Sequence, residues 1–217
     1  IFKGGPMGKI CYGQRSYHFS LLVLAMDVIK NHTIILGSQS PRRKKLLAGL
    51  DIPFEVRVAD IDESFPSNMP IPKIAEYVAT QKWKALISNS KDDELIICSD
   101  TVVVLDKTIL EKPKDKKDGK QMLQKLSGQK HTVITGVALG TRNEFHSFSD
   151  STHVYFANLS AEEIDYYLDN YEPYDKAGSY GVQEWIGMMA IEKLEGSYYN
   201  VMGLPVQKLY QVLKNWG

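Results

Sequence analysis

A strand-like run that leads directly into a helix start is the feature that most constrains the fold of this chain. Residues 33–37 form the apolar, largely β-branched run Thr-Ile-Ile-Leu-Gly, which is typical of a buried strand. Ser40 belongs to a residue type that caps helices, and Pro41 suits the first helical position, where its missing N–H needs no partner. The sequence therefore predicts a buried strand followed by a short helix over residues 41–49, as in α/β proteins.

The rest of the chain continues to alternate between strand-like and helix-like patterns. Further strands are expected at residues 54–58, 94–98, 102–105, 132–139, 151–156 and 188–194. Further helices are expected at residues 71–87, 115–126, 160–170 and 204–213. No repeat or low-complexity linker is visible. We therefore predict an α/β fold with a mixed sheet and surrounding helices, rather than an all-parallel doubly wound sheet.

The first part of the chain does not share this pattern. A short apolar run at residues 19–25 follows a weakly basic segment and faintly resembles a signal peptide, but charged residues follow at once and no convincing cleavage site is present. We interpret residues 1–25 as an extension outside the fold and Met26 as the natural start. A single domain is then expected over residues 26–217, with no segment long enough to span a membrane.

The composition excludes several classes of protein. Lys and Arg together number 26 and so do Asp and Glu, and this balance argues against a stable nucleic-acid partner, which usually requires a basic excess. The two cysteines are far apart, and the five histidines show no metal-binding spacing. A disulfide framework or a structural zinc site is therefore not expected, and a cytoplasmic location is the default.

Four consecutive cations, residues 42–45, occupy the first turn of the helix predicted after Ser40. Positive charge at this end opposes the helix dipole. The arrangement is explained if free backbone N–H groups, the hydroxyls of Ser38 and Ser40, and the guanidinium groups of Arg42 and Arg43 bind a phosphate chain. The alternative is a solvated basic turn, and the local sequence leaves both interpretations open.

Two carboxylates are candidates for metal binding or base catalysis. Asp100 comes directly after the most hydrophobic predicted strand, where a carboxylate is presented at the mouth of a crevice. Glu63 lies in an acidic connection after another strand, and Mg²⁺ prefers such oxygen ligands together with substrate phosphates. Taken alone, Asp100 is more often part of an ordinary turn, and Glu63 part of a solvated loop.

Lysines and a glycine-rich segment add further candidates. Lys112 precedes a proline that restricts its backbone, while Lys82 lies in the middle of a predicted helix and could simply be on its exposed face. Residues 175–183 contain two glycines around Ser-Tyr, which suits close approach of backbone to a ligand. Gln183 ends this segment and carries both a donor and an acceptor, as needed to read a base edge. A similar segment at residues 196–205 also has the form of a turn into the last helix.

In their order along the chain, these segments resemble the Maf family of nucleoside triphosphate pyrophosphatases, once described as septum-formation inhibitors. The matching segments, which extend over nearly everything from residue 33 onward, are residues 38–43 (SQSPRR), 62–64 (DES), 99–102 (SDTV), 112–113 (KP), 126–128 (LSG), 131–133 (HTV), 175–183 (DKAGSYGVQ) and 196–205 (GSYYNVMGLP). One such motif would be weak evidence, but the ordered set is specific.

The resemblance implies an activity and a fold. It implies hydrolysis between the α and β phosphates of a nucleoside triphosphate, giving the monophosphate and pyrophosphate, with Mg²⁺ or Mn²⁺ as cofactor. It also implies the elongated, two-lobed α/β fold of the inosine-triphosphate pyrophosphatases, with a central cleft and often a homodimer.

The resemblance also implies roles for individual residues. The family's catalytic positions fall on Arg43, Glu63, Lys82, Asp100 and Lys112. Glu63 and Asp100 are expected to bind the metal, and Asp100 is the usual proton acceptor. Substrate binding is expected from Ser38, Ser40, Arg42, Thr101 and Gln183.

Three positions favour the branch of the family that acts on dTTP and UTP, namely Arg42, Thr101 and Gln183. The branch that acts on 7-methyl-GTP commonly has Trp in place of the first arginine, so it is the alternative, together with other modified nucleotides. A departure from the family is that Glu184 follows Gln183 where Gly is usual, which affects the rim of the base pocket.

A second alternative is a non-catalytic, nucleotide-binding regulator of septum formation. The presence of both Glu63 and Asp100 argues against it, because a pure binding protein has little need of two carboxylates beside a phosphate site.

Overall fold

The computed structural model describes residues 27–216 of the chain. The extension predicted over residues 1–25 and the start predicted at Met26 lie outside the described residues. The single domain over residues 26–217 stays a prediction.

Strands and helices alternate along the chain as the sequence predicts. The strands are β1 (Thr33–Leu36), β2 (Glu55–Val56), β3 (Glu94–Leu105), β4 (Thr108–Leu110), β5 (Lys130–Gly140), β6 (Phe145–Phe156) and β7 (Ile191–Glu195). The helices are α2 (Asp27–Asn31), α3 (Pro41–Ala48), α4 (Ile71–Ile87), α5 (Lys116–Leu126), α6 (Ala161–Tyr171), α7 (Trp185–Ala190), α8 (Tyr198–Met202) and α9 (Val206–Lys214). Two short 3₁₀ turns, η1 (Pro173–Asp175) and η2 (Ala177–Ser179), lie in the glycine-rich segment.

The strands form one seven-stranded sheet in the order β2-β1-β3-β5-β6-β7, with β4 paired to β3. Strand β1 is parallel to both β2 and β3, whereas the remaining pairs are antiparallel. The mixed α/β sheet predicted from the sequence is therefore confirmed.

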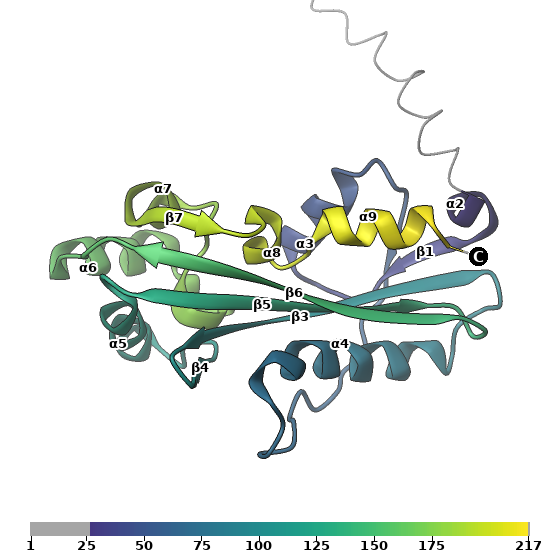
Figure 1. Cartoon of the computed structure of the whole chain (residues 1–217), viewed down its shortest axis with the longest axis horizontal. Coiled ribbons are helices and arrows are strands. Elements are labelled where there is room, and N and C mark those ends of the chain that lie inside the picture. The colour runs from purple at the N-terminus through teal and green to yellow at the C-terminus, as the bar shows by residue number, and fades with distance from the viewer. Residues whose placement is uncertain (1–26, 217) are drawn as a thin grey trace, which may run out of the picture.

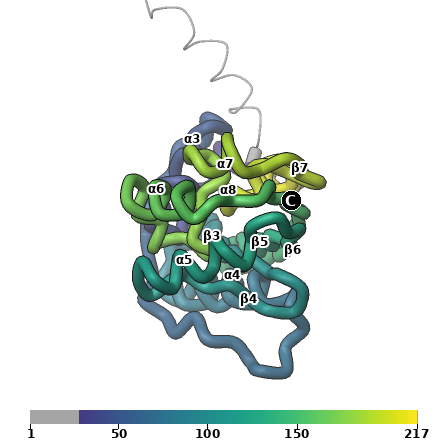
Figure 2. The backbone as a smooth tube through the Cα atoms, turned by 90° about the vertical axis from the view of Figure 1, so that its left-hand side faces the viewer, coloured from purple at the N-terminus to yellow at the C-terminus, as the bar shows by residue number. Residues whose placement is uncertain are grey.

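The sheet is elongated along β5 and β6, and different helices cover its two faces and its ends (Figure 1). Helix α4 lies under one face, while α3, α8 and α9 lie on the other. Helices α5 and α6 gather at the far end of the long strands, and the view turned by 90° shows them in front of that end (Figure 2).

Strand β3 contributes to both faces because successive side chains of a strand point in opposite directions. Leu95 and Ile97 pack into the core beneath α3 and α9. Ile96 and Cys98 pack on the opposite face, against α4. The continuous apolar sequence of this strand thus reflects burial on both faces.

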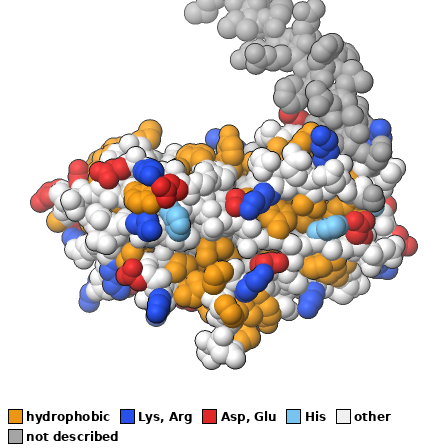
Figure 3. Space-filling view, viewed as in Figure 1, with side chains coloured by type: hydrophobic (Ala, Val, Ile, Leu, Met, Phe, Trp, Pro, Cys, Tyr) orange, Lys and Arg blue, Asp and Glu red, His pale blue; other side chains and the backbone are white. Residues whose placement is uncertain are grey.

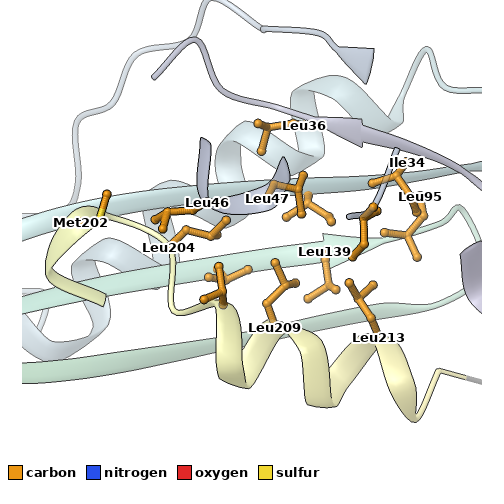
Figure 4. Packing of buried hydrophobic residues seen from close by; sticks show 14 of the residues in the cluster. Ile34, Leu36, Leu46, Leu47, Leu95, Leu139, Met202, Leu204, Leu209 and Leu213 are labelled. Carbon is orange, nitrogen blue, oxygen red and sulfur yellow. The ribbon is translucent and has the colours of Figure 1, made fainter. Parts of the chain in front are cut away.

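Both ends of the described chain contribute to the core beneath α3 and α9. Leu36 and Leu47, from the start of the fold, pack with Leu204, Leu209 and others from its end (Figure 4). Each of these four leucines is buried, and full burial of such a side chain stabilises the fold by roughly 1.5–3 kcal/mol. A separate cluster fills the other end of the sheet, between α5, α6 and α7.

Gly136 of β5 permits the close packing of α4 on the sheet. A Cβ atom at this position would fall against the backbone of Ala75 and Glu76. Gly136, which interrupts an otherwise β-rich run in the sequence, is therefore explained by the approach of the helix.

Two of the predicted strands are shorter in the structure than expected. Residues 188–194 were expected to form a strand, but α7 continues to Ala190 and β7 begins only at Ile191. The apolar sequence there does not distinguish a short helix from a strand, and the helix forms because the N–H groups of Gly187 and Met188 both donate to the carbonyl of Glu184. The strand expected over residues 54–58 is shorter, since only Glu55 and Val56 pair with β1.

The surface shows no single charged field on the face seen in Figure 3, where acidic and basic side chains alternate with hydrophobic ones. Within residues 27–216, none of the helices combines the length and apolar character needed to cross a bilayer.

Candidate functional site

All of the residues predicted for the site line one cavity of about 740 Å³. They are Ser38, Ser40, Arg42, Arg43, Glu63, Lys82, Asp100, Thr101, Lys112 and Gln183. They come from the start of α3, the connection after β2, helix α4, strand β3, the segment after β4 and the glycine-rich segment. The sequence thus predicts correctly which residues lie together.

A gap along one edge of β3 makes room for this cavity. Strand β5 pairs with one edge of β3 from Ile96 to Val104. On the other edge, β1 pairs only as far as Ile97, and β4 begins to pair only at Val103. Residues 98–102 therefore have no neighbouring strand on that side, and Asp100 and Thr101 lie in the gap.

The position of Asp100 differs from the prediction that it follows the end of a strand. Residues 94–98 and 102–105 belong to one continuous strand, and Asp100 lies within it. Pairing with β5 keeps the polar residues 99–101 extended, so the chain does not turn there. Asp100 is nevertheless accessible from the cavity because of the gap between β1 and β4.

Helix α3 begins as the sequence predicts. The Ser40 hydroxyl accepts a hydrogen bond from the N–H of Arg43 at 3.5 Å, and Pro41 occupies the first turn. The Ser38 hydroxyl accepts from the N–H of Ser40 at 3.2 Å. This turn lines the cavity, so the N-terminal end of α3, where helix N–H groups favour anions, faces the site.

Arg43 is held rigidly in the wall of the cavity. Its Nε donates to the carbonyl of Gly203 at 2.9 Å, and its Nη2 donates to the Thr101 hydroxyl at 3.1 Å. Its Nη1 lies 3.4 Å from the Ser38 hydroxyl. Burial lowers the pKa of Arg43, an effect that the charge of Asp100 partly offsets. A guanidinium with donors to spare can bind an anion while these bonds hold its plane.

Arg42 has a different environment, although it is adjacent in sequence. Its Nη1 lies 2.8 Å from Asp175 Oδ2, so it joins α3 to the glycine-rich segment across the cavity. Burial alone would raise the pKa of Asp175, but hydrogen bonds from Lys176 and Arg42 outweigh it and lower that pKa.

Lys82 joins the two candidate carboxylates. Its Nζ lies 2.7 Å from Asp100 Oδ1 and 3.0 Å from Glu63 Oε1. Its side chain is only 13% exposed, so the interpretation that Lys82 lies on the exposed face of its helix is wrong. Asp100 is 16% exposed, whereas Glu63 is 51% exposed and sits at the outer side of the group.

The donor set around Asp100 fits a hard divalent cation that is shared with a substrate. One oxygen of each carboxylate contacts Lys82, which leaves the other oxygen of each for a metal ion. Within residues 27–216, no group of three or more His, Cys, Asp or Glu side chains is arranged to hold a metal without other ligands. Mg²⁺ commonly binds through one or two carboxylates plus substrate phosphates, and the two carboxylates here match that number.

Lys112 lies where this cavity meets a smaller one of about 370 Å³. Glu63, Asp100 and Thr101 also line both cavities. Lys112 therefore lines the same two cavities as the candidate carboxylates.

The glycine-rich segment forms the opposite wall. Gly178 has a φ of +71°, a conformation that glycine adopts without strain, and it packs against Val103 of β3. Tyr180 lines the cavity, and its hydroxyl lies 2.8 Å from His131 Nε2 in the buried region behind it. Burial lowers the pKa of His131 to about 4.

Sequence reasoning missed the charged network behind Gln183. Lys176 is buried, and its Nζ lies 2.6 Å from Asp175 Oδ1 and 3.1 Å from Glu184 Oε1. The Tyr167 hydroxyl of α6 donates to Glu184 Oε2. Lys176 could have been found, because it stands within the glycine-rich segment, but nothing in the sequence of α6 connects Tyr167 with the site.

Comparisons with known proteins identify relatives over most of the chain. The family model described as "Maf-like protein" matches residues 33–216. The dTTP/UTP pyrophosphatase of Porphyromonas gingivalis (strain W83) is 53% identical over 195 residues, which cover 88% of this chain and 98% of that protein. The dTTP/UTP pyrophosphatase of Parabacteroides distasonis is 50% identical over 192 residues, covering 88% of this chain and 100% of that protein.

Among solved structures, the Staphylococcus aureus Ham1 protein shows a weak likeness. It has a TM-score of 0.42 and 13% identity, and the match covers 58% of this chain and 72% of that protein. At this level the likeness supports no conclusion about the site.

Proposed function

This chain belongs to the Maf-like protein family, and from that membership we propose that it is a nucleoside triphosphate pyrophosphatase that acts on dTTP and UTP. The reaction is hydrolysis of the bond between the α and β phosphates, which gives the nucleoside monophosphate and pyrophosphate. The observation that carries the proposal is the contact of Lys82 with both Asp100 and Glu63, in the same cavity as the N-terminus of α3.

The phosphate chain is bound by the cations of the cavity. Arg43 and Lys112 line the cavity together with Asp100, and we assign their charges to binding of the phosphate oxygens. The N-terminus of α3 adds backbone donors and the hydroxyls of Ser38 and Ser40. These fixed donors stabilise negative charge on the phosphate oxygens and on the pyrophosphate that leaves.

Asp100 orients the attacking water and accepts its proton. The water oxygen then forms a bond to the α phosphorus, and the bond from that phosphorus to the bridging oxygen breaks. Lys82 holds Asp100 in place through its 2.7 Å contact with Oδ1. This contact leaves the second carboxylate oxygen for the water. A carboxylate within reach of the proton that it accepts is the geometric requirement for a general base.

The cofactor proposed is Mg²⁺ or Mn²⁺, held by Glu63 and Asp100 together with substrate phosphates. Such an ion supplies charge that stabilises developing negative charge on the phosphate oxygens.

We assign the choice between nucleotide bases to the cavity wall formed by the glycine-rich segment, residues 175–183. Gln183 lines the cavity, and Arg42 reaches that wall through Asp175. Thr101, the third position that favours the pyrimidine branch, acts through Arg43, because its hydroxyl accepts a hydrogen bond from Nη2 of that guanidinium. A homodimer, a cytoplasmic location and the lack of a stable nucleic-acid partner remain part of the proposal.

The test is to measure pyrophosphate release by the purified chain from dTTP, UTP, CTP and 7-methyl-GTP with Mg²⁺ present. We expect the monophosphate and pyrophosphate in equal amounts, with dTTP and UTP as the preferred substrates. A preference for 7-methyl-GTP would favour the other branch of the family, and tight nucleotide binding without hydrolysis would support a non-catalytic regulator.

A further inference from the structure

The side-chain amide of Gln183 has a fixed orientation in the cavity wall. Its Nε2 donates to Glu184 Oε1 at 3.2 Å. Its Oε1 is inaccessible and has no hydrogen-bond partner among the described residues. Because Gln183 lines the cavity while its oxygen is buried, the polar atom that it offers to a ligand is the amide nitrogen.

Glu184 determines this orientation because a carboxylate can only accept hydrogen bonds. If the amide of Gln183 were rotated by half a turn, its oxygen would face the oxygen of Glu184, and the two would repel each other. The amide therefore directs one N–H toward Glu184, which leaves its second N–H available to a ligand.

The Glu184 carboxylate is itself held by further contacts. Oε1 also contacts the buried ammonium of Lys176 at 3.1 Å, and Oε2 accepts the hydroxyl proton of Tyr167. That hydroxyl in turn accepts from the N–H of Gly181 at 3.1 Å. Burial is the larger cause and the hydrogen bond to Glu184 the smaller cause of a raised pKa of Tyr167, so its hydroxyl stays protonated and remains a donor.

We propose that Glu184 is a positioning residue that fixes Gln183 as a hydrogen-bond donor to the carbonyl oxygen at position 4 of a pyrimidine base. This inference rests on the proposed action on dTTP and UTP. Uracil and thymine carry an oxygen acceptor at position 4, whereas cytosine carries an amino group, which is a donor. A donor fixed in the wall thus selects against cytosine, because two donors would face each other without an acceptor.

The test compares UTP with CTP as substrates of the Glu184→Gln variant. The substitution keeps the size of the side chain, but the new amide can donate hydrogen bonds as well as accept them. Gln183 can then turn its oxygen toward the amino group of cytosine. We expect the ratio of kcat/KM for UTP to that for CTP to fall about tenfold, the size of one hydrogen bond. The matched control is Glu192→Gln, an exposed glutamate of β7, which should keep the wild-type ratio.

A merely structural role for Glu184 gives a different result. In that case kcat/KM would fall by the same factor for both substrates, the ratio would not change, and the inference would be overturned. If the Glu184→Gln variant does not fold, Glu184→Ala carries the test, because it removes the acceptor that fixes the amide of Gln183. A ratio about threefold below that of the wild type would support the inference, and an unchanged ratio would overturn it.

A binding measurement separates this inference from the proposed function. The affinities of α,β-methylene UTP and α,β-methylene CTP are measured by calorimetry for the wild type and for Glu184→Gln. A preference for the uridine analogue that the variant loses supports the role of Glu184, even if no nucleotide is hydrolysed. Equal loss of affinity for both analogues overturns it, even if the wild type is an active pyrophosphatase.

Discussion

Asp100 and Thr101 are adjacent on β3 and point to opposite faces of the sheet, yet both line the same cavity. Asp100 contacts Lys82 of α4 at 2.7 Å, and Thr101 contacts Arg43 of α3 at 3.1 Å. The gap in the sheet beside residues 98–102 makes this arrangement accessible from one side. The following predictions depend on it.

Replacing Asp100 with Asn should reduce turnover of UTP by several orders of magnitude, because the amide cannot accept a proton from water. The substitution keeps the size of the side chain, so the thermal unfolding temperature should change little. Asp106→Asn is the matched control, since Asp106 is exposed in the turn after β3 and asparagine tolerates its φ of +54°. Pyrophosphate release near the wild-type rate from Asp100→Asn would refute the role of this carboxylate.

Replacing Lys82 with Gln should lower kcat roughly a hundredfold, because Asp100 and Glu63 lose the cation that holds both. Steady-state kinetics with UTP measures the effect. Lys84→Gln removes the same charge from an exposed position two residues further along α4 and should leave kcat unchanged. Equal effects of the two substitutions would show that only the general charge of the helix matters.

Replacing Arg43 with Lys should reduce both stability and activity, because a lysine cannot bond at once with Gly203 and Thr101. Loss of hydrogen bonds from a charged group predicts a decrease of about 2 kcal/mol in the free energy of unfolding. Urea denaturation of the variant and the wild type measures it. An unchanged midpoint would mean that these bonds do not stabilise the fold.

Removing divalent cations with EDTA should abolish pyrophosphate release, and added Mg²⁺ or Mn²⁺ should restore it. Glu63→Gln should raise the Mg²⁺ concentration that gives half-maximal activity by about tenfold, because one metal ligand is weakened. Glu55→Gln, at an exposed position of β2, serves as the control. Full activity in EDTA would contradict the metal requirement.

Stability should fall below about pH 6.5 because of the buried His131. Burial lowers the pKa of His131 in the folded protein to about 4, whereas an unfolded histidine titrates near 6.5. The unfolded chain therefore binds the proton first, so the stabilisation is complete above about pH 6.5 and is lost as the pH falls toward 4. Between about pH 7 and pH 5 the loss is on the order of 2 kcal/mol.

Urea denaturation across this pH range checks the prediction. The His131→Gln variant should lose most of the pH dependence, and His146→Gln, at an exposed position of β6, should keep it. An identical slope in His131→Gln and the wild type would contradict the assignment.

The parts of the structure that follow local rules could be predicted from the sequence. Ser40 and Pro41 mark the start of α3, and the apolar runs mark β1 and β3, because capping and burial act over a few residues. The ordered motifs of the family also predicted residues that line one cavity, and the roles of these residues stay predictions.

Features that depend on contacts between distant segments could not be predicted. The gap beside Asp100 exists because β1 ends and β4 begins at particular places along β3, which no local pattern specifies. Likewise, the apolar residues 188–190 suit a helix or a strand equally well. The helix forms because the carbonyl of Glu184 accepts hydrogen bonds from the N–H groups of Gly187 and Met188. The network that joins Tyr167 to Glu184 depends on where α6 packs.

The core beneath α3 and α9 has a consequence for the order in which the protein can form during synthesis. Arg43 bonds to Gly203, which lies 160 residues later, and Leu36 packs with Leu204 and Leu209. During synthesis α3 therefore leaves the ribosome long before the segment that contains Gly203 and Leu209 has been made. The apolar faces of β1 and α3 therefore stay uncovered until the end of synthesis. A chain that ends before α9 should lack much of this core, and a chain that ends before Gly203 should also lack the carbonyl that holds Arg43.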